Sequence, residues 1–132
     1  MNGALEKILY VEDDPDIRAI GAFALESVGG LTVRACGSGA EAVAAAAEFE
    51  PQLLLLDVMM PQMDGPATLQ ALRALDVTAS TPAVFMTAKV QPREIEHYGR
   101  LGAIDVIAKP FDPMTLAAQV RAIFERVAEM AS

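Results

Sequence analysis

Residues 53–65 read LLLLDVMMPQMDG and place a carboxylate directly after the most apolar run of the chain. Four successive leucines are typical of a strand that is covered on both faces, as in a parallel sheet with helices on each side. Asp57 follows them with no polar residue in between, although a charge at the edge of a protein interior is costly unless it has a partner. The stretch therefore predicts a buried strand that carries Asp57 at its tip as a functional residue.

Further short apolar runs occupy residues 7–12, 31–36, 83–87 and 105–109, and segments with helical periodicity separate them. In the last such segment Leu116, Val120, Ile123 and Val127 share one helix face. Because five predicted strands alternate with five predicted helices, we expect an α/β fold with a parallel sheet between two helical layers.

Several helix starts are marked by an acceptor side chain that can cap the first free N–H groups. In two of them a proline follows at the first helical position, where its missing N–H costs nothing. The predicted starts are Asp14-Pro15, the capping box of Ser38 and Glu41, Asp64-Gly65-Pro66 and Asp112-Pro113.

The composition indicates one folded domain, because 132 residues that are 53% hydrophobic can bury a single core. We expect this domain to cover residues 1–132. The only cysteine, Cys36, leaves no partner for an internal disulfide, and with no signal peptide or membrane-spanning run we expect a cytoplasmic protein. The 18 acidic residues outnumber the 10 basic ones, and without a basic cluster we expect no direct binding to nucleic acid.

The predicted strands end in residues that can act together. The first ends in Glu12 and Asp13, the third in Asp57, the fourth in Thr87 and Ala88, and the fifth in Lys109. In parallel sheets these ends share one edge, where ligands bind. Clustered carboxylates repel one another unless a cation offsets the repulsion, and oxygen ligands suit Mg²⁺. A carboxylate beside Mg²⁺ can attack phosphorus to give an aspartyl phosphate.

The segments LYVEDDPD, LLLLDVMMPQMDG, VFMTAK and AKPFD resemble, in this order and spacing, the receiver domains of response regulators in two-component signalling. The resemblance implies a flavodoxin-like, doubly wound sheet with strand order 2-1-3-4-5. It also implies that Asp57 accepts a phosphoryl group from the phosphohistidine of a sensor histidine kinase or a histidine phosphotransfer protein. The protein would then be a signalling phosphoacceptor and not an enzyme.

The same resemblance implies a Mg²⁺ site formed by Glu12, Asp13, Asp57 and Met59. Asp13 would bind the metal directly and Glu12 through water, while Met59 would contribute only its backbone carbonyl. Oxygen ligands that leave a few positions open for water and phosphate oxygens suit this ion.

Around the phosphoryl group, the resemblance assigns Thr87 as the switch hydroxyl and Lys109 as the paired cation. Ala88 would leave room for the phosphoryl oxygens. The peptide bond before Pro110 is cis in most receivers. Val106 departs from the family, which often has Tyr or Phe at this position, and its presence removes the ring whose movement usually reports phosphorylation.

The resemblance also implies a surface for partners, formed by the fourth helix, the fifth strand and the fifth helix. We expect it to bind a downstream target or a second copy of the chain, and we place His97, Tyr98 and Arg100 there. The chain is either a free-standing regulator or a receiver that belongs to a larger regulator or hybrid kinase.

Two other functions remain possible on the sequence. GSGAEA, residues 37–42, fits a dinucleotide-binding fingerprint, but it follows the second predicted strand and leaves Thr87 and Lys109 without a role. A phosphorylation-independent interaction module on the same fold usually lacks the acceptor or the lysine, whereas this sequence has both Asp57 and Lys109.

Overall fold

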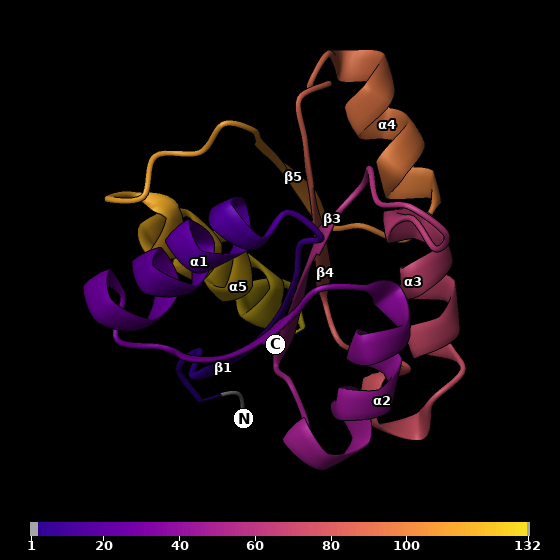
Figure 1. The fold of residues 1–132 in the computed structure, drawn as a ribbon, viewed down its shortest axis with the longest axis horizontal. Coiled ribbons are helices and arrows are strands. Elements are labelled where there is room, and N and C mark those ends of the chain that lie inside the picture. Colours follow the sequence, from indigo (N-terminus) through magenta and orange to yellow (C-terminus); the bar gives the residue numbers. More distant parts are fainter. Residues whose placement is uncertain (1–2, 132) are drawn as a thin grey trace.

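The computed structural model describes residues 3–131, which form one parallel sheet covered by helices on both faces (Figure 1). The strands are β1 (Lys7–Val11), β2 (Thr32–Cys36), β3 (Leu53–Asp57), β4 (Ala83–Thr87) and β5 (Asp105–Ala108). They pair in the order β2-β1-β3-β4-β5, and every pair is parallel. The predicted α/β fold and its strand order are thus confirmed.

Helices connect the strands and begin where the sequence signals them in most cases. They are α1 (Pro15–Phe23), α2 (Gly39–Phe49), α3 (Gly65–Arg73), α4 (Pro92–Arg100) and α5 (Leu116–Ala131), with a π-helical turn η1 (Ala24–Val28) after α1 and a 3-10 turn η2 (Asp76–Thr78) before β4. The carboxylate of Asp14 accepts from the backbone N of Asp16 and Ile17, at 2.9 and 3.1 Å. Ser38 and Asp64 cap α2 and α3 in the same way, so these three predicted starts are confirmed.

The predicted start of the last helix is wrong by three residues. The carboxylate of Asp112 accepts from the backbone N of Met114 at 2.9 Å and so closes a local turn. The carbonyl of Asp112 accepts from the N of Leu116 at 3.0 Å, and α5 begins only there. An aspartate before a proline can stabilise such a turn as well as a helix start, which is why the signal was ambiguous.

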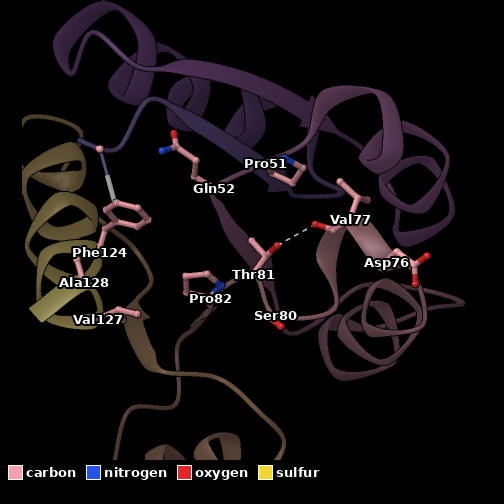
Figure 2. Close-up of a pocket in the computed structure, with 11 residues that line it drawn as sticks. Pro51, Gln52, Asp76, Val77, Ser80, Thr81, Pro82, Phe124, Val127 and Ala128 are labelled. Atoms are coloured by element: carbon pink, nitrogen blue, oxygen red, sulfur yellow. Dashed lines mark hydrogen bonds between the residues drawn. The ribbon is translucent and has the colours of Figure 1, made fainter. Parts of the chain in front are cut away.

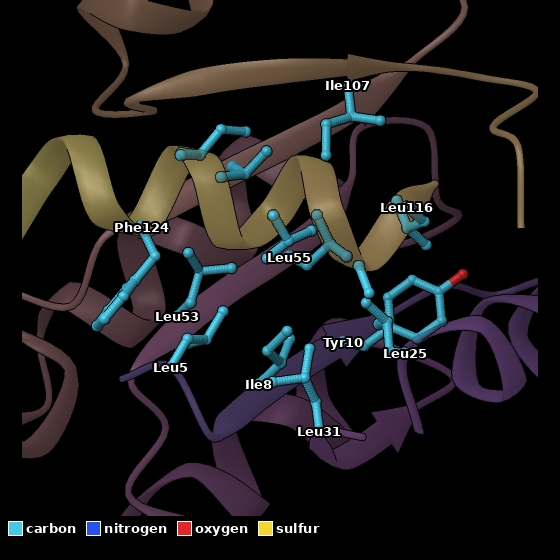
Figure 3. Packing of buried hydrophobic residues seen from close by; sticks show 14 of the residues in the cluster. Leu5, Ile8, Tyr10, Leu25, Leu31, Leu53, Leu55, Ile107, Leu116 and Phe124 are labelled. Atoms are coloured by element: carbon cyan, nitrogen blue, oxygen red, sulfur yellow. The ribbon is translucent and has the colours of Figure 1, made fainter. Parts of the chain in front are cut away.

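The four leucines of β3 explain why both faces of the sheet are apolar. Leu53 and Leu55 point into a core with η1 and α5, and Leu54 and Leu56 point into a core with α2, α3 and α4. All four side chains are fully buried. Figure 3 shows the first core, where Leu116 and Phe124 of α5 lie over the sheet. Full burial of one leucine side chain contributes about 1.5–3 kcal/mol to the stability of the fold. Because only a strand covered on both faces can bury all four, the leucines favour the central position of β3.

A hollow at the amino edge of the sheet lies far from the predicted site in the fold. The loops before β3 and β4 and the last turns of α5 line it, with Gln52, Thr81 and Phe124 among its residues (Figure 2). The hydroxyl of Thr81 donates to the carbonyl of Val77 at 3.4 Å. The carboxylates that the sequence singled out lie at the opposite, carboxyl edge.

Candidate functional site

The carboxyl ends of four strands bring the predicted residues together. Val11 pairs with Leu56, so that the residues after β1 lie beside the tip of β3. Thr87 pairs with Ala108, which places Lys109 immediately beyond the edge of the sheet. The predicted runs 7–12 and 105–109 were each one residue too long, since β1 ends at Val11 and β5 at Ala108.

Three carboxylates form the centre of this edge. One oxygen from each of Glu12, Asp13 and Asp57 lies within 4.8 Å of the others. Glu12 and Asp57 are buried, with 1% and 3% of their surfaces exposed, while Asp13 reaches the solvent. The structure therefore gathers the acidic residues that the sequence predicted for a metal site.

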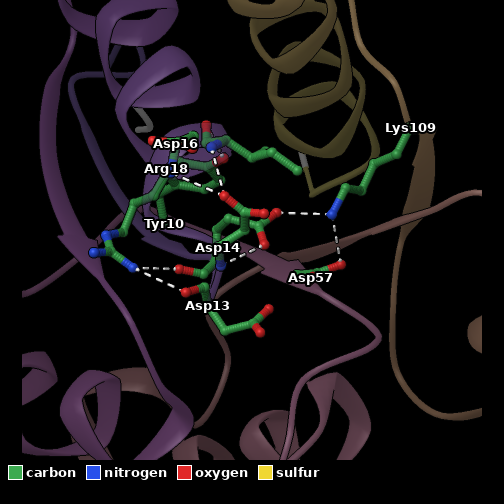
Figure 4. Close-up of polar contacts among 9 residues, drawn as sticks. Tyr10, Asp13, Asp14, Asp16, Arg18, Asp57 and Lys109 are labelled. Atoms are coloured by element: carbon green, nitrogen blue, oxygen red, sulfur yellow. Dashed lines mark hydrogen bonds and ion pairs between the residues drawn. The ribbon is translucent and has the colours of Figure 1, made fainter.

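Lys109 joins two of these carboxylates. Its Nζ lies 2.8 Å from Oε1 of Glu12 and 3.2 Å from Oδ1 of Asp57 (Figure 4). Burial acts to lower the pKa of Lys109, but its hydrogen bonds to Glu12 and Asp57 outweigh this effect, so that the pKa is raised. The ammonium group therefore stays charged between the two anions.

Asp57 is harder to ionise than an ordinary aspartate. Burial and the negative charge of Glu12 raise its pKa from 3.8 to about 6, although the hydrogen bond from Lys109 acts in the opposite direction. One lysine thus compensates the pair only in part, and a further cation beside Asp57 would favour its charged form.

Thr87 lies at the same edge, at the end of β4. It is 3% exposed, and its hydroxyl accepts a hydrogen bond from the backbone N of Lys89 at 3.1 Å. Ala88 is exposed beside it. The peptide bond between Lys109 and Pro110 is cis, as expected from the resemblance.

The two methionines after Asp57 lie in different surroundings. The side chain of Met59 is 75% exposed, whereas Met60 is buried. Met59, two residues after Asp57, thus faces the solvent.

Two residues that hold the site were missed by the sequence analysis. Arg18 donates to the backbone carbonyls of Glu12 and Asp13 (Figure 4), and Gly65 packs directly on the backbone of Asp57. The glycine of the MDG segment was a signal for the second contact. The contact of Arg18 had no such signal, because the direction in which two loop carbonyls point cannot be read from a sequence.

The assignment of His97, Tyr98 and Arg100 to one surface is wrong for Tyr98. This side chain is 8% exposed, and its ring makes an edge contact with Phe85, with the ring centres 5.5 Å apart. His97 and Arg100 are exposed, as expected. The burial of Tyr98 fastens α4 to the sheet.

The family model of the response regulator receiver domain matches residues 8–121. The chain is 36% identical over 126 residues to the DNA-binding response regulator MtrA of Mycolicibacterium smegmatis, and 34% identical over 122 residues to the DNA-binding dual master transcriptional regulator RpaA of a Synechocystis species. These matches cover 96% and 92% of this chain but 54% and 50% of those proteins. The chain thus spans about half the length of the curated relatives that it matches.

Solved structures agree with this result. The chemotaxis protein CheY4 of Vibrio cholerae superposes with a TM-score of 0.83 at 29% identity, covering 91% of this chain and 99% of that one. The N-terminal domain of a response regulator receiver protein from Methanoculleus marisnigri gives 0.70 at 34% identity, with coverages of 94% and 97%.

The chain belongs to the response regulator receiver family. It is a receiver domain of two-component signalling, and the members of this family are signalling phosphoacceptors. This assignment confirms the predicted class and leaves the dinucleotide fingerprint of residues 37–42 without a function: Ser38 caps α2 by accepting from the N of Glu41 at 3.1 Å. Within residues 3–131, each helix is too short or too polar to cross a membrane.

Proposed function

We propose that Asp57 is the phosphoacceptor of this receiver domain. The observation that carries the proposal is the position of Asp57 beside Lys109, which also pairs with Glu12, at the tip of a strand that is fully buried. Such a stem holds the carboxylate still, and phosphoryl transfer depends mainly on positioning and on neutralisation of charge.

In the proposed reaction a carboxylate oxygen of Asp57 forms a bond to phosphorus, and the bond from phosphorus to the donor atom breaks. The donor atom keeps the electron pair, and the product is an acyl phosphate. Lys109, at 3.2 Å from Asp57, can neutralise a phosphoryl oxygen. Thr87 and Ala88 lie where a hydroxyl donor and open space would serve the other oxygens, once the Thr87 hydroxyl turns away from Lys89.

Glu12, Asp13, Asp57 and the backbone carbonyl of Met59 are the proposed ligands of Mg²⁺. The fit is supported by the three carboxylate oxygens within 4.8 Å and by the raised pKa of Asp57, because a hard cation relieves the repulsion that one lysine leaves. When bound, Mg²⁺ would neutralise the phosphoryl oxygens during transfer.

Response regulators interact with histidine kinases and with output targets. For this chain we propose a sensor histidine kinase or a histidine phosphotransfer protein as the donor. We propose the face of α4, β5 and α5 for the target or for a homodimer. Its support is a set of exposed apolar side chains on or next to these elements: Ile95, Leu101, Ile104 and Met130.

We further propose that residues 1–132 form one receiver domain that acts in the cytoplasm, either alone or within a larger regulator or hybrid kinase. Its role is that of a phosphoacceptor and not of an enzyme with a separate substrate. Two relatives are named as DNA-binding proteins, but this chain matches only half of each. The acidic charge of −8 supports our prediction that this domain does not itself contact nucleic acid.

The test is phosphorylation by acetyl phosphate and Mg²⁺, followed by intact-mass measurement. We expect one added phosphoryl group on the native protein, none on Asp57→Asn, and one on the control Asp76→Asn, whose carboxylate is exposed in η2. Equal labelling of Asp57→Asn would refute the assignment, and no labelling of the native protein would favour a phosphorylation-independent module.

A further inference from the structure

Arg18, the fourth residue of α1, donates hydrogen bonds to the backbone of the loop between β1 and α1. Its Nη1 donates to the carbonyl oxygen of Glu12 at 2.9 Å and to that of Asp13 at 3.4 Å. Figure 4 shows the guanidinium group on the side of the loop opposite to Lys109. One side chain therefore binds the backbone of both acidic residues without touching their carboxylates.

Two backbone N–H groups of this loop have partners of their own. The backbone N of Glu12 donates to the carbonyl of Cys36 at 3.0 Å, as a continuation of the sheet. The N of Asp14 donates to Oε2 of Glu12 at 3.2 Å. Arg18 supplies the donor for the two carbonyls that lie past the end of β1, where the sheet offers none and partly buried acceptors require one.

Gly37 leaves the space that the guanidinium group occupies. A Cβ atom at this position would lie 2.9 Å from Nη1 and 3.4 Å from Cζ of Arg18. The backbone N of Gly37 is in turn held by Oε1 of Glu41 at 3.0 Å. The loops after β1 and β2 thus form a slot for Arg18, and the side chain has little freedom to leave the two carbonyls.

We infer that Arg18 is a positioning residue for metal binding: by holding the carbonyls of Glu12 and Asp13, it aims their carboxylates at Asp57 and so tightens the binding of Mg²⁺. The inference rests on the proposed Mg²⁺ site. Its physical basis is that groups behind the ligands of a metal orient them, and their loss commonly weakens metal binding by about 10- to 100-fold.

The charge of Arg18 acts in the opposite direction, which makes the inference easy to test. A cation near the site repels Mg²⁺, so its removal should tighten binding if electrostatics alone mattered. If Arg18 acts by positioning, the neutral variant Arg18→Met should instead bind Mg²⁺ more weakly. Because Arg18 acts only through backbone carbonyls, we expect the Kd to rise by about 10-fold, at the low end of the range for such groups.

The experiment is a Mg²⁺ titration of the unphosphorylated protein by calorimetry, with the shifts of the Glu12, Asp13 and Asp57 amides followed by NMR. The variants are Arg18→Met and Arg18→Leu, which have no donor, and Arg18→Lys should restore part of the affinity because an ammonium group can still donate. The control is Arg93→Met, which removes an equal charge from an exposed ion pair with Glu94 and should leave the Kd unchanged or slightly lower.

The dissociation constant of the folded protein separates positioning from stability, because a purely structural role would lower the melting temperature and leave the Kd as it is. If Arg18→Met does not fold, Arg18→Leu decides. Native-like or tighter binding by either neutral variant would overturn the inference. A native protein that binds no Mg²⁺, or an Asp13→Asn variant that binds it equally well, would instead refute the proposed metal site.

Discussion

Gly65 lies directly against the backbone of Asp57. A Cβ atom on Gly65 would stand 2.6 Å from the carbonyl oxygen of Asp57 and 2.9 Å from Cα of Val58. The N of Gly65 also donates to the carbonyl of Val58 at 2.9 Å. The first turn of α3 is thus pressed onto the tip of β3, and any side chain at this position must displace the acceptor strand.

We therefore expect Gly65→Ala to destabilise the protein and to slow its phosphorylation. Backbone atoms cannot move aside as a flexible side chain does, so the cost should be about 1–3 kcal/mol, as for other overpacked sites. Urea unfolding and the rate of labelling by acetyl phosphate measure the two effects. The control is Gly99→Ala in α4, where a Cβ atom meets nothing within 4 Å and alanine should raise stability slightly.

The raised pKa of Asp57 predicts how stability depends on pH without metal. Since folding raises this pKa from 3.8 to about 6, the folded state binds the proton more tightly than the unfolded state. The resulting contribution is fully present below pH 3.8 and is lost as the pH rises through about 6. At neutral pH the charge of Asp57 then costs about 3 kcal/mol.

Asp57→Asn should therefore melt at a higher temperature than the native protein in EDTA at neutral pH, and the difference should shrink toward pH 4. Added Mg²⁺ should stabilise the native protein by mass action and the variant much less. Differential scanning calorimetry with and without millimolar Mg²⁺ measures both effects. A variant that melts lower in EDTA, or that gains as much from Mg²⁺ as the native protein, would contradict a shared acidic site.

The strands, and the meeting of the carboxylates with Lys109 at one edge of the sheet, were predictable because each leaves a local mark on the sequence. Buried runs such as LLLL show where strands lie, and the residue types at their ends show the chemistry. The start of α5 was not predictable, since the side chain of Asp112 prefers the N of Met114. Nor was the burial of Tyr98, because a helix as short as α4 shows its apolar face in only a few residues.

The π-helical turn η1 and the contacts of Arg18 were invisible for a related reason. Each depends on where backbone carbonyls point after folding. Gly29 N reaches the carbonyl of Ala24 at 3.1 Å, five residues back, and no residue type marks such a turn. Arg18 has no local signal in the sequence, because its partners are two carbonyls of the loop after β1.

The rim of the site predicts a long-lived phosphoryl group. Met59 is 75% exposed beside the site, and Lys89 is exposed in the loop after β4. A thioether and an ammonium group cannot accept a proton from an attacking water or orient it as a carboxylate or amide can. We expect Met59→Asn and Lys89→Glu to shorten the phosphoryl lifetime several-fold, measured by the loss of label after removal of the donor.

A matched control for this comparison is Met114→Asn, because Met114 is also exposed, at 69%, but lies in the turn before α5. It should leave the lifetime unchanged. If neither rim substitution alters the rate of hydrolysis, water is positioned by other groups.

The conformational switch should run through the loop after β4 and not through β5. Phosphorylation gives the Thr87 hydroxyl a charged oxygen to donate to, and a hydrogen bond to a charged acceptor is stronger than one to a neutral acceptor. When the hydroxyl turns toward this oxygen, it loses the hydrogen bond that it accepts from the backbone N of Lys89 at 3.1 Å, which holds the loop in the unphosphorylated protein. Val106 is half-buried against the core under α4, and its short, β-branched side chain has one stiff torsion and no ring to swing into the vacated space.

We therefore expect large amide shifts over residues 87–95 on addition of beryllofluoride, a phosphoryl mimic, while the Val106 methyl groups keep their rotamer. Two-dimensional NMR spectra with and without the mimic measure this, and Thr87→Ala should abolish the loop shifts. A change of rotamer at Val106 with a quiet loop would identify β5 as the moving part.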